Sequence, residues 1–281
     1  MYRISKVLNH NTIIGIHVSD NQEYLIMGKG VGFGKKVAER VEARPQDKIY
    51  SLKESTSRGD ARELISAIHP IYLEIASEVL ENAEKTFESL DKNVIFPMAD
   101  HIAFAVKRIQ MQEQISNPLH EDIRVLFYSE YKAAECIRSI LKEKLNINIT
   151  EDEIGYVALH IHSAIQDENV SQAMHMAQAV RECISLIEEL TGRVIDVQSL
   201  SYNRLMNHIR YMVARTLHGE KLKIGMNEYM KIKFPQSYEL AQKICDKVSV
   251  NLKKKLDEME IGYLAIHIER VLYDETNESL M

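Results

Sequence analysis

The first 53 residues carry the apolar spacing of β-strands. Ile14, Ile16 and Val18 recur at every second position, which is the period of a strand with one buried face. A second apolar run covers residues 24–27, and turns rich in asparagine, aspartate and glycine separate the runs. We therefore expect a small antiparallel β domain over residues 1–55. A core of that size is marginal, so oligomerisation would be a source of extra stability.

The apolar spacing becomes helical beyond residue 60. Residues 54–60 (ESTSRGD) are polar and include a glycine, so their composition predicts a linker. Further along, Ile102, Ala105, Val106 and Ile109 recur at steps of three and four residues and share one face of a helix. Few glycines and prolines interrupt such patterns, so we expect the rest of the chain to be helical.

The helical part contains two copies of one pattern. Residues 100–108 (DHIAFAVKR) parallel residues 207–215 (NHIRYMVAR), at an offset of 107 residues. Residues 153–161 (EIGYVALHI) parallel residues 260–268 (EIGYLAIHI) at the same offset. A constant offset between separate blocks indicates a duplicated globular domain, with a period too long for a solenoid. The fold class that we expect is therefore mainly α with a small N-terminal β domain. The expected domains are residues 1–55, 63–168 and 170–278.

The composition is that of an ordinary globular protein. The 281 residues are 45% hydrophobic and 27% charged, and the net charge is −6. Residues 1–60 hold ten basic and seven acidic side chains, a net of +3, so the other 221 residues carry −9. This asymmetry permits a polyanionic partner for the N-terminal part and disfavours one elsewhere.

Cysteine usage and hydropathy indicate the compartment. Three cysteines lie far apart in the sequence, which argues against a disulfide framework and favours a reducing environment. No apolar run is long enough to span a bilayer, and the first residues lack the apolar core of a signal peptide. We expect a cytoplasmic protein without membrane insertion.

Two histidines recur in each copy of the repeat. They are His101 and His160 in the first copy and His208 and His267 in the second. His101 lies at the edge of the apolar stripe, and Arg108 lies within about 20° of it on the same side of the helix. Arg215 stands in the same relation to His208. Because a guanidinium binds phosphate oxygens with a planar fork of donors, this pattern indicates phosphohistidines with Arg108 and Arg215 as phosphate-neutralising candidates. The alternative is packed, hydrogen-bonded histidines beside solvated or ion-paired arginines.

A metal site is a rival use of these histidines. His160 and His162 would share one face of a strand, but on a helix they are about 200° apart, and the second copy has Glu269 at the matching place. The sequence also lacks a phosphate loop, a dinucleotide-binding glycine fingerprint, a nucleophile elbow and an HExxH motif. We expect no metal, no cofactor and no enzymatic activity.

The glycine-rich segment at residues 28–36 (GKGVGFGKK) is a candidate nucleic-acid surface. Glycines let a backbone approach a partner closely, lysines neutralise phosphates, and Phe33 could stack on an unpaired RNA base. Asn9 and Asn11 could hydrogen-bond to base edges. The alternative is a plain hairpin tip, with Phe33 in a small core and the lysines solvated.

These motifs together resemble a known family over essentially the whole chain. Residues 6–13 (KVLNHNTI) and 27–36 (MGKGVGFGKK) are similar to the signature of the co-antiterminator (CAT) RNA-binding domain. The four histidine motifs are similar to those of the paired regulation domains (PRD) of the sugar phosphotransferase system. The order, spacing and length resemble the bacterial antiterminators of β-glucoside, sucrose and glucose operons, and the GKGVGFGKK form looks most like the glucose type.

This resemblance implies an RNA-binding transcription antiterminator. A dimer of the N-terminal domain would bind a hairpin in nascent mRNA and keep an overlapping terminator stem from folding, so that sugar-uptake genes are transcribed. By position, the residues at the RNA surface would be Lys6, Asn11, Gly28, Lys29, Phe33 and Lys36. Several relatives carry arginine at the position of Lys29; lysine keeps the charge but loses the bidentate fork, which puts the RNA preference in doubt.

The resemblance also implies control by histidine phosphorylation. His101 and His160 would take phosphate from the sugar permease when sugar is absent, and this would inactivate the protein. His208 and His267 would take phosphate from the phosphocarrier HPr. A phosphate adds roughly 1.5–2 negative charges, so two such groups facing each other across a homodimer axis would repel.

A DNA-binding sugar regulator with the same regulation domains is the alternative from another class. It would need a helix-turn-helix at the N-terminus, whereas residues 1–53 have the spacing of strands. We therefore do not expect DNA as a partner.

Overall fold

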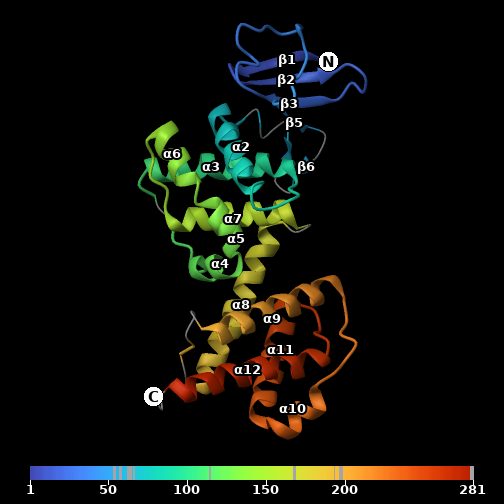
Figure 1. The fold of residues 1–281 in the computed structure, drawn as a ribbon, viewed down its shortest axis with the longest axis vertical. Coiled ribbons are helices and arrows are strands. Elements are labelled where there is room, and N and C mark those ends of the chain that lie inside the picture. The colour runs from blue at the N-terminus through green and yellow to red at the C-terminus, as the bar shows by residue number, and fades with distance from the viewer. Residues whose placement is uncertain are drawn as a thin grey trace. The chain divides into compact units, whose positions relative to one another are not determined.

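The structure is a computed structural model that describes residues 1–52, 55–56, 59–61, 65, 67–113, 115–166, 169–192, 194–195 and 199–278. Its contacts divide the chain into two compact units (Figure 1). The first unit consists of Met1–His120 and Phe127–Val170, and the second of Glu121–Leu126 and Ser171–Met281. A mainly helical chain with a small N-terminal antiparallel sheet is the fold class that the sequence predicts, and that prediction is confirmed.

Antiparallel strands form the N-terminal sheet in the order β4-β1-β2-β3-β5 (Figure 1). Their bounds are β1 Tyr2–Asn9, β2 Thr12–His17, β3 Glu23–Met27, β4 Arg40–Val41 and β5 Lys48–Ser51. The expected face of β2 is wrong in detail. Val18 lies beyond the strand and is 59% exposed, and Ile13 is fully buried whereas Ile14 and Ile16 are half-buried. The sheet has apolar contacts on both faces, because Ile13 packs inside the β domain and Ile14 packs against the helical core.

Part of the expected linker forms a pair of strands. β6 (Ser55–Thr56) and β7 (Gly59–Asp60) pair antiparallel, so their backbone groups satisfy each other. The prediction of a structureless linker is therefore wrong at these four positions. Residues 54, 57 and 58 lie outside the described residues.

Helices α3 and α7 carry the first copy of the histidine motifs. The helical elements of this unit are α2 (Pro70–Ala83), η1 (Lys92–Val94), α3 (Ile95–Gln110), α5 (Tyr128–Ala134), α6 (Ile137–Leu145) and α7 (Glu151–Ile165). Asn146, in the left-handed conformation, ends α6, and the Thr150 side chain accepts a hydrogen bond from a backbone N–H in the first turn of α7. Ile102 and Val106 of α3 and Ile154 of α7 are buried in one apolar core, so the two helices pack with their histidine motifs facing.

The second unit repeats this arrangement with longer helices. Its helices are α8 (Val170–Thr191), α9 (Leu200–His218), α10 (Asn227–Lys233), α11 (Pro235–Leu252) and α12 (Met259–Glu278), joined by residues 121–126 of α4 (His120–Leu126). At the offset of 107 residues, α10 matches α4, α9 matches α3 and α12 matches α7, so the duplication extends from sequence to structure. The residues that match α5 and α6 form one continuous helix, α11, in this copy. None of the described helices is long and apolar enough to cross a membrane.

Candidate functional site

One buried carboxylate joins a histidine to an arginine in the first unit. His101 of α3 and His160 of α7 are both buried, with ring centroids 5.5 Å apart. Oε2 of Glu153, in the first turn of α7, lies 3.1 Å from Nε2 of His101. Arg108 donates from Nε and Nη2 to Oε1 of the same carboxylate, at 3.1 and 2.7 Å. We call His101, Arg108, Glu153 and His160 the first cluster.

The second unit contains the same four residue types at matching positions. His208 of α9 stacks on His267 of α12, with ring centroids 4.6 Å apart and an interplanar angle of 23°. Arg215 donates from Nε to Oε1 of Glu260 at 2.7 Å and from Nη2 to Oε2 at 2.8 Å. Nε2 of His208 lies 3.9 Å from Oε2 of Glu260. We call His208, Arg215, Glu260 and His267 the second cluster.

The electrostatics of the clusters follow from burial and pairing. Burial alone would raise the pKa of Glu153, but hydrogen bonds and charge from His101 and Arg108 outweigh it and hold that pKa below its ordinary value. Glu153 is therefore ionised at neutral pH and can only accept hydrogen bonds. In the second cluster, burial lowers the pKa of His208 to about 3, and the charges of neighbouring groups add to this. Burial also lowers the pKa of His267, so both rings are neutral at pH 7.

The structure brings the four predicted histidines together in two pairs, each beside its predicted arginine. Both arginines are ion-paired, so packed histidines beside ion-paired arginines, the alternative that the sequence left open, describe this conformation. Sequence reasoning missed Glu153 and Glu260. The signal was available, because both copies place a glutamate immediately before the same apolar helical pattern.

His162 points away from His160, as expected for residues two apart on a helix. Its Nδ1 lies 2.9 Å from Oε1 of Glu130, and its ring lies against Phe127. At the matching positions of the second copy, Ser237 Oγ donates to Oε2 of Glu269 at 2.6 Å. Among the residues that the structure describes, no group of three or more histidine, cysteine, aspartate or glutamate side chains could hold a metal ion.

The predicted RNA-contact residues Asn11 and Gly28 lie in an ordered loop beside the β1–β2 turn. Oδ1 of Asn11 accepts a hydrogen bond from the backbone N–H of Gly30 at 2.9 Å, and the Asn11 N–H donates to Oδ1 of Asn9 at 2.8 Å. A Cβ atom at Gly28 would lie 1.9 Å from Oδ1 of Asp47, so only glycine fits there. The asparagines therefore fix the loop, which restricts how they could present their side chains to a ligand.

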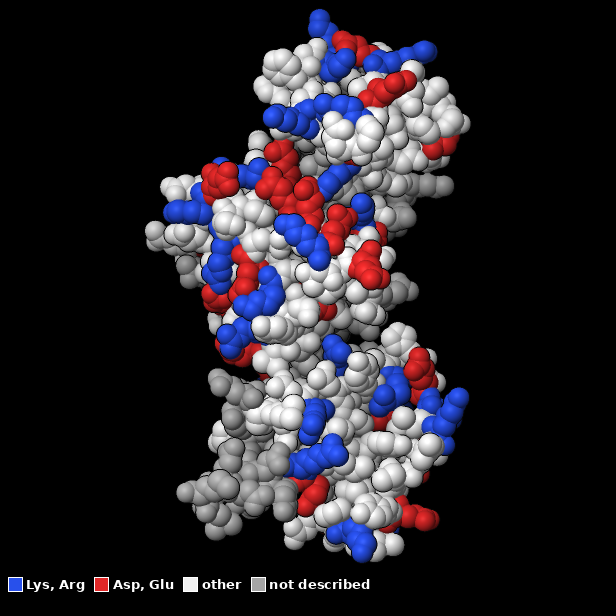
Figure 2. Space-filling model, in the orientation of Figure 1, with Lys and Arg blue, Asp and Glu red and all other residues white. Residues whose placement is uncertain are grey.

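The remaining predicted contact residues are exposed. Phe33 is 68% exposed and meets the ring of His10 edge-on, with centroids 5.2 Å apart, so a place in the core is excluded for it. Lys6 on β1 and Lys29 and Lys36 in the loop are exposed as well. Figure 2 shows lysine and arginine side chains at several places on the surface of the β domain. This surface can offer positive charge and an aromatic face to a polyanion.

Arg44 is a loop residue that sequence reasoning missed. Its Nη2 donates to the backbone carbonyl of Lys29 at 2.7 Å and to Oδ1 of Asp47 at 3.0 Å. The backbone N–H of Arg44 donates to Oδ2 of the same aspartate at 2.8 Å. Arg44 and Asp47 thus hold the backbone on which Lys29 stands.

Helix α2 lies against this loop with its acidic face. A pocket of about 380 Å³ is lined by Asn11, Gly28 and Lys29 on one side and by carboxylates of α2 on the other. Those carboxylates belong to Glu74, Glu78 and Glu81. The Asn9 side chain donates to Oε1 of Glu74 at 2.9 Å. Acidic side chains gather below the β domain on the face shown in Figure 2. RNA phosphates at this edge would therefore meet negative charge next to the lysines.

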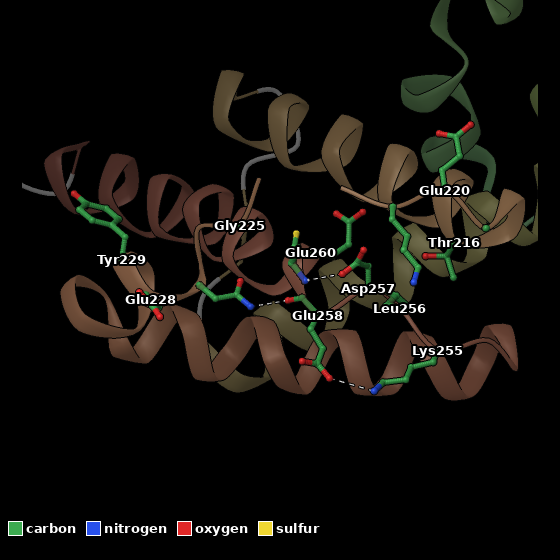
Figure 3. Close-up of a pocket in the computed structure, with 14 residues that line it drawn as sticks. Thr216, Glu220, Gly225, Glu228, Tyr229, Lys255, Leu256, Asp257, Glu258 and Glu260 are labelled. Atoms are coloured by element: carbon green, nitrogen blue, oxygen red, sulfur yellow. Dashed lines mark hydrogen bonds and ion pairs between the residues drawn. The ribbon is translucent and has the colours of Figure 1, made fainter. Parts of the chain in front are cut away.

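A larger pocket, of about 950 Å³, lies in the second unit between the end of α9, α10 and the start of α12 (Figure 3). Five carboxylates and two lysines line it, so it does not suit a phosphate. Asn227 shapes its floor by donating to the Glu258 carbonyl at 2.8 Å and accepting from the Gly262 N–H at 2.9 Å. Glu260 lines this pocket as well, so the second cluster is reached from it only through its carboxylate.

Comparison with known proteins adds a family to this geometry. Residues 2–58 match the CAT RNA binding domain, and residues 73–164 and 181–271 each match the PRD domain. The chain is 29% identical to the GlcA/glcB genes antiterminator of Staphylococcus carnosus, over 99% of this chain and 97% of that protein. It is 31% identical to Protein GlcT of Staphylococcus epidermidis, over 95% of each. The crystal structure of GlcT CAT-PRDI matches with 32% identity and a TM-score of 0.50, covering 59% of this chain and 98% of that chain.

Proposed function

This chain belongs to the family of transcription antiterminators that carry a CAT RNA-binding domain and two PRD domains, and from that membership we propose how it acts. It is an RNA-binding regulator and not an enzyme. It binds a hairpin in the leader of a nascent transcript, prevents a terminator from forming, and so permits transcription of glucose phosphotransferase genes. This function places it in the cytoplasm, where transcripts are made. Its functional division is residues 1–55, 63–168 and 170–278.

The observation that carries the proposal is the exposure of Phe33 on a fixed loop. A small β domain gains stability from every aromatic side chain that it buries, yet 68% of this one is exposed. Its neighbours in the loop are lysines, which neutralise phosphates. An exposed aromatic beside lysines suits an unpaired base in an RNA loop or bulge. Lys6, Asn11, Gly28, Lys29, Phe33 and Lys36 are the residues that we assign to this surface.

The first experiment compares two exposed apolar side chains of the same domain. Phe33→Ala should weaken binding of the leader hairpin by about 10-fold to 100-fold, since stacking on one base contributes roughly 1–3 kcal/mol. Val18→Ala is the matched control, because Val18 is 59% exposed and lies outside the loop. Binding is measured by gel shift with the RNA hairpin and with duplex DNA. Equal affinities of the two variants, or stronger binding to duplex DNA, would contradict the proposal.

Regulation acts through the two clusters. We assign His101 and His160 to phosphorylation by the phosphoryl domain of the sugar permease, and His208 and His267 to phosphorylation by HPr. Arg108 and Arg215 are the candidates for neutralising the added charge. In a homodimer, phosphate in the first cluster adds roughly 1.5–2 negative charges per chain, and this repulsion shifts the balance between two dimer arrangements.

A pair of substitutions at one position tests this regulation. His101→Ala removes the acceptor and should raise antitermination in cells without sugar, whereas His101→Asp mimics a permanent charge and should lower it. The measurement is expression of a reporter gene placed behind the leader and its terminator. If both variants change expression in the same direction and to the same extent, the first cluster does not act through added charge.

A further inference from the structure

The ring nitrogens of the first histidine in each cluster have different surroundings. Nε2 of His101 exposes less than 1 Å² and lies 3.1 Å from Oε2 of Glu153. Nε2 of His208 exposes less than 1 Å² as well and points toward Glu260, although at 3.9 Å. Both histidines keep some exposed surface, 8% of the residue for His101, and it lies elsewhere than at Nε2. The two nitrogens of His101 are therefore not equivalent toward a phosphoryl donor.

Glu153 determines which nitrogen of His101 carries the proton. An ionised carboxylate has no hydrogen to donate, and a neutral imidazole has one N–H and one lone pair. With Glu153 ionised at 3.1 Å, the N–H lies on Nε2 and the lone pair on Nδ1. A phosphoryl group on Nε2 would also have to occupy the buried space beside this carboxylate, where two negative charges would repel.

We propose that Glu153 is the positioning residue of the first cluster and that His101 accepts its phosphoryl group on Nδ1. This inference rests on the proposed function only for the identity of the biological donor. The Nδ1 lone pair attacks the phosphorus of a phosphorylated donor, and a new N–P bond forms as the donor's bond to phosphorus breaks. The departing donor atom keeps the electron pair of that bond. The Nε2 proton stays between the ring and Glu153, so nothing is oxidised or reduced and the acceptor releases no proton.

The second cluster supplies an internal control. Arg215 occupies both oxygens of Glu260, and the longer distance to His208 leaves the tautomer of that ring unfixed by the carboxylate. Burial of Nε2 still makes Nδ1 the reachable nitrogen of His208. Replacing the glutamate should therefore change phosphorylation strongly in the first cluster and little in the second.

The experiment determines which nitrogen is phosphorylated in the full-length chain. Protein with ¹⁵N-labelled histidine rings is treated with phosphoramidate, a small chemical donor, or with phosphorylated HPr or permease domain. Phosphorus–nitrogen couplings in NMR spectra then distinguish Nδ1 from Nε2. The His101→Ala variant identifies the signal of His101 by its loss. We expect Nδ1 phosphorylation at His101 with every donor that labels it.

Glu153→Gln tests the positioning role. Arg108 donates to Oε1, so the glutamine turns its carbonyl to Arg108 and its amide N–H to Nε2 of His101. The lone pair then lies on the buried nitrogen, and labelling of His101 should fall at least 10-fold. Glu260→Gln should change labelling of His208 less than 3-fold. Thermal unfolding of each variant verifies that it is folded, and the nitrogen that carries any residual phosphate separates positioning from loss of structure.

The outcomes separate this inference from the proposed function. Phosphate on Nε2 of His101, or no label at His101 from any donor, overturns the inference. Equal labelling of His101 in Glu153→Gln and the parent chain overturns the positioning role of Glu153. Labelling of Nδ1 by phosphoramidate without any labelling by HPr or permease supports the inference while the proposed regulation fails.

Discussion

The two clusters contain the same four residue types at the same offset, yet they divide one carboxylate differently. In the first, Arg108 uses only Oε1 of Glu153, and Oε2 lies 3.1 Å from His101. In the second, Arg215 forks across both oxygens of Glu260, and His208 lies 3.9 Å away. Helix positions are nearly the same in the two units, so side-chain geometry decides which donor each carboxylate oxygen receives.

This difference changes what each histidine can rely on. His101 has a fixed charge at its Nε2 atom, and its proton is held in place. His208 stacks on His267 and stays neutral because burial lowers its pKa to about 3. A duplicated domain can therefore keep the acceptor residues and vary the control of their tautomer and charge. Three predictions test this comparison, in order of expected effect.

The largest expected effect comes from removing each arginine. Arg215→Met leaves Glu260 buried with its only near cation gone, and we expect a loss of about 3 kcal/mol of stability, the low end of the cost of stranding a buried charge. Arg108→Met should cost about 1–2 kcal/mol less, because Glu153 keeps His101 at 3.1 Å. Chemical denaturation of the full chain, followed by hydrogen exchange of α9 and α3, assigns each loss to its unit. Equal costs would show that His101 contributes nothing to holding Glu153.

Acid unfolding should begin in the second unit. An unfolded histidine has a pKa of about 6.5, so below that pH the unfolded chain binds a proton that folded His208, with a pKa of about 3, does not bind. Stability is thus present above pH 6.5 and is lost as pH falls toward 3. The loss is nearly 1.4 kcal/mol per pH unit, or about 2 kcal/mol between pH 6 and pH 4.5.

The first unit has a different pH window. The pKa of Glu153 is held below its ordinary value, so the stability from its pairing is present above the unfolded pKa of about 4.3 and is lost only as pH falls below it. Hydrogen exchange between pH 6 and pH 4.5 should therefore show α9 and α12 losing protection before α3 and α7. His208→Gln cannot be protonated and should remove most of that difference. Earlier loss in α3 would reverse the comparison.

The sequence was sufficient for the architecture because periodicity and duplication are properties of many residues at once. The β domain, the helical remainder and the repeated histidines all follow from spacing, and a single deviating residue such as Val18 does not alter them. Partners of individual side chains are set by a few tenths of an ångström across two helices, which spacing along one helix does not encode. Thr150 and Glu153 illustrate this, since their spacing is typical of a helix capping box, whereas the glutamate points to α3. The face of β2 failed for a related reason, because the sheet is covered on both sides.

The smallest expected effect comes from exchanging a polar pair between the copies. His162 faces Glu130 in the first copy, and Glu269 faces Ser237 at the matching positions of the second. His162→Glu alone places two carboxylates against each other in a largely buried site and should destabilise the first unit by about 2 kcal/mol. Adding Glu130→Ser supplies the hydroxyl donor that Ser237 supplies to Glu269, so the double variant should lie within about 1 kcal/mol of the parent chain. A double-mutant cycle from denaturation midpoints gives the coupling between the two positions, which should be at least about 1 kcal/mol in favour of the matched pair. Additive effects would mean that the two copies do not share one local geometry here, and the comparison between the clusters, which depends on that shared frame, would have to be withdrawn.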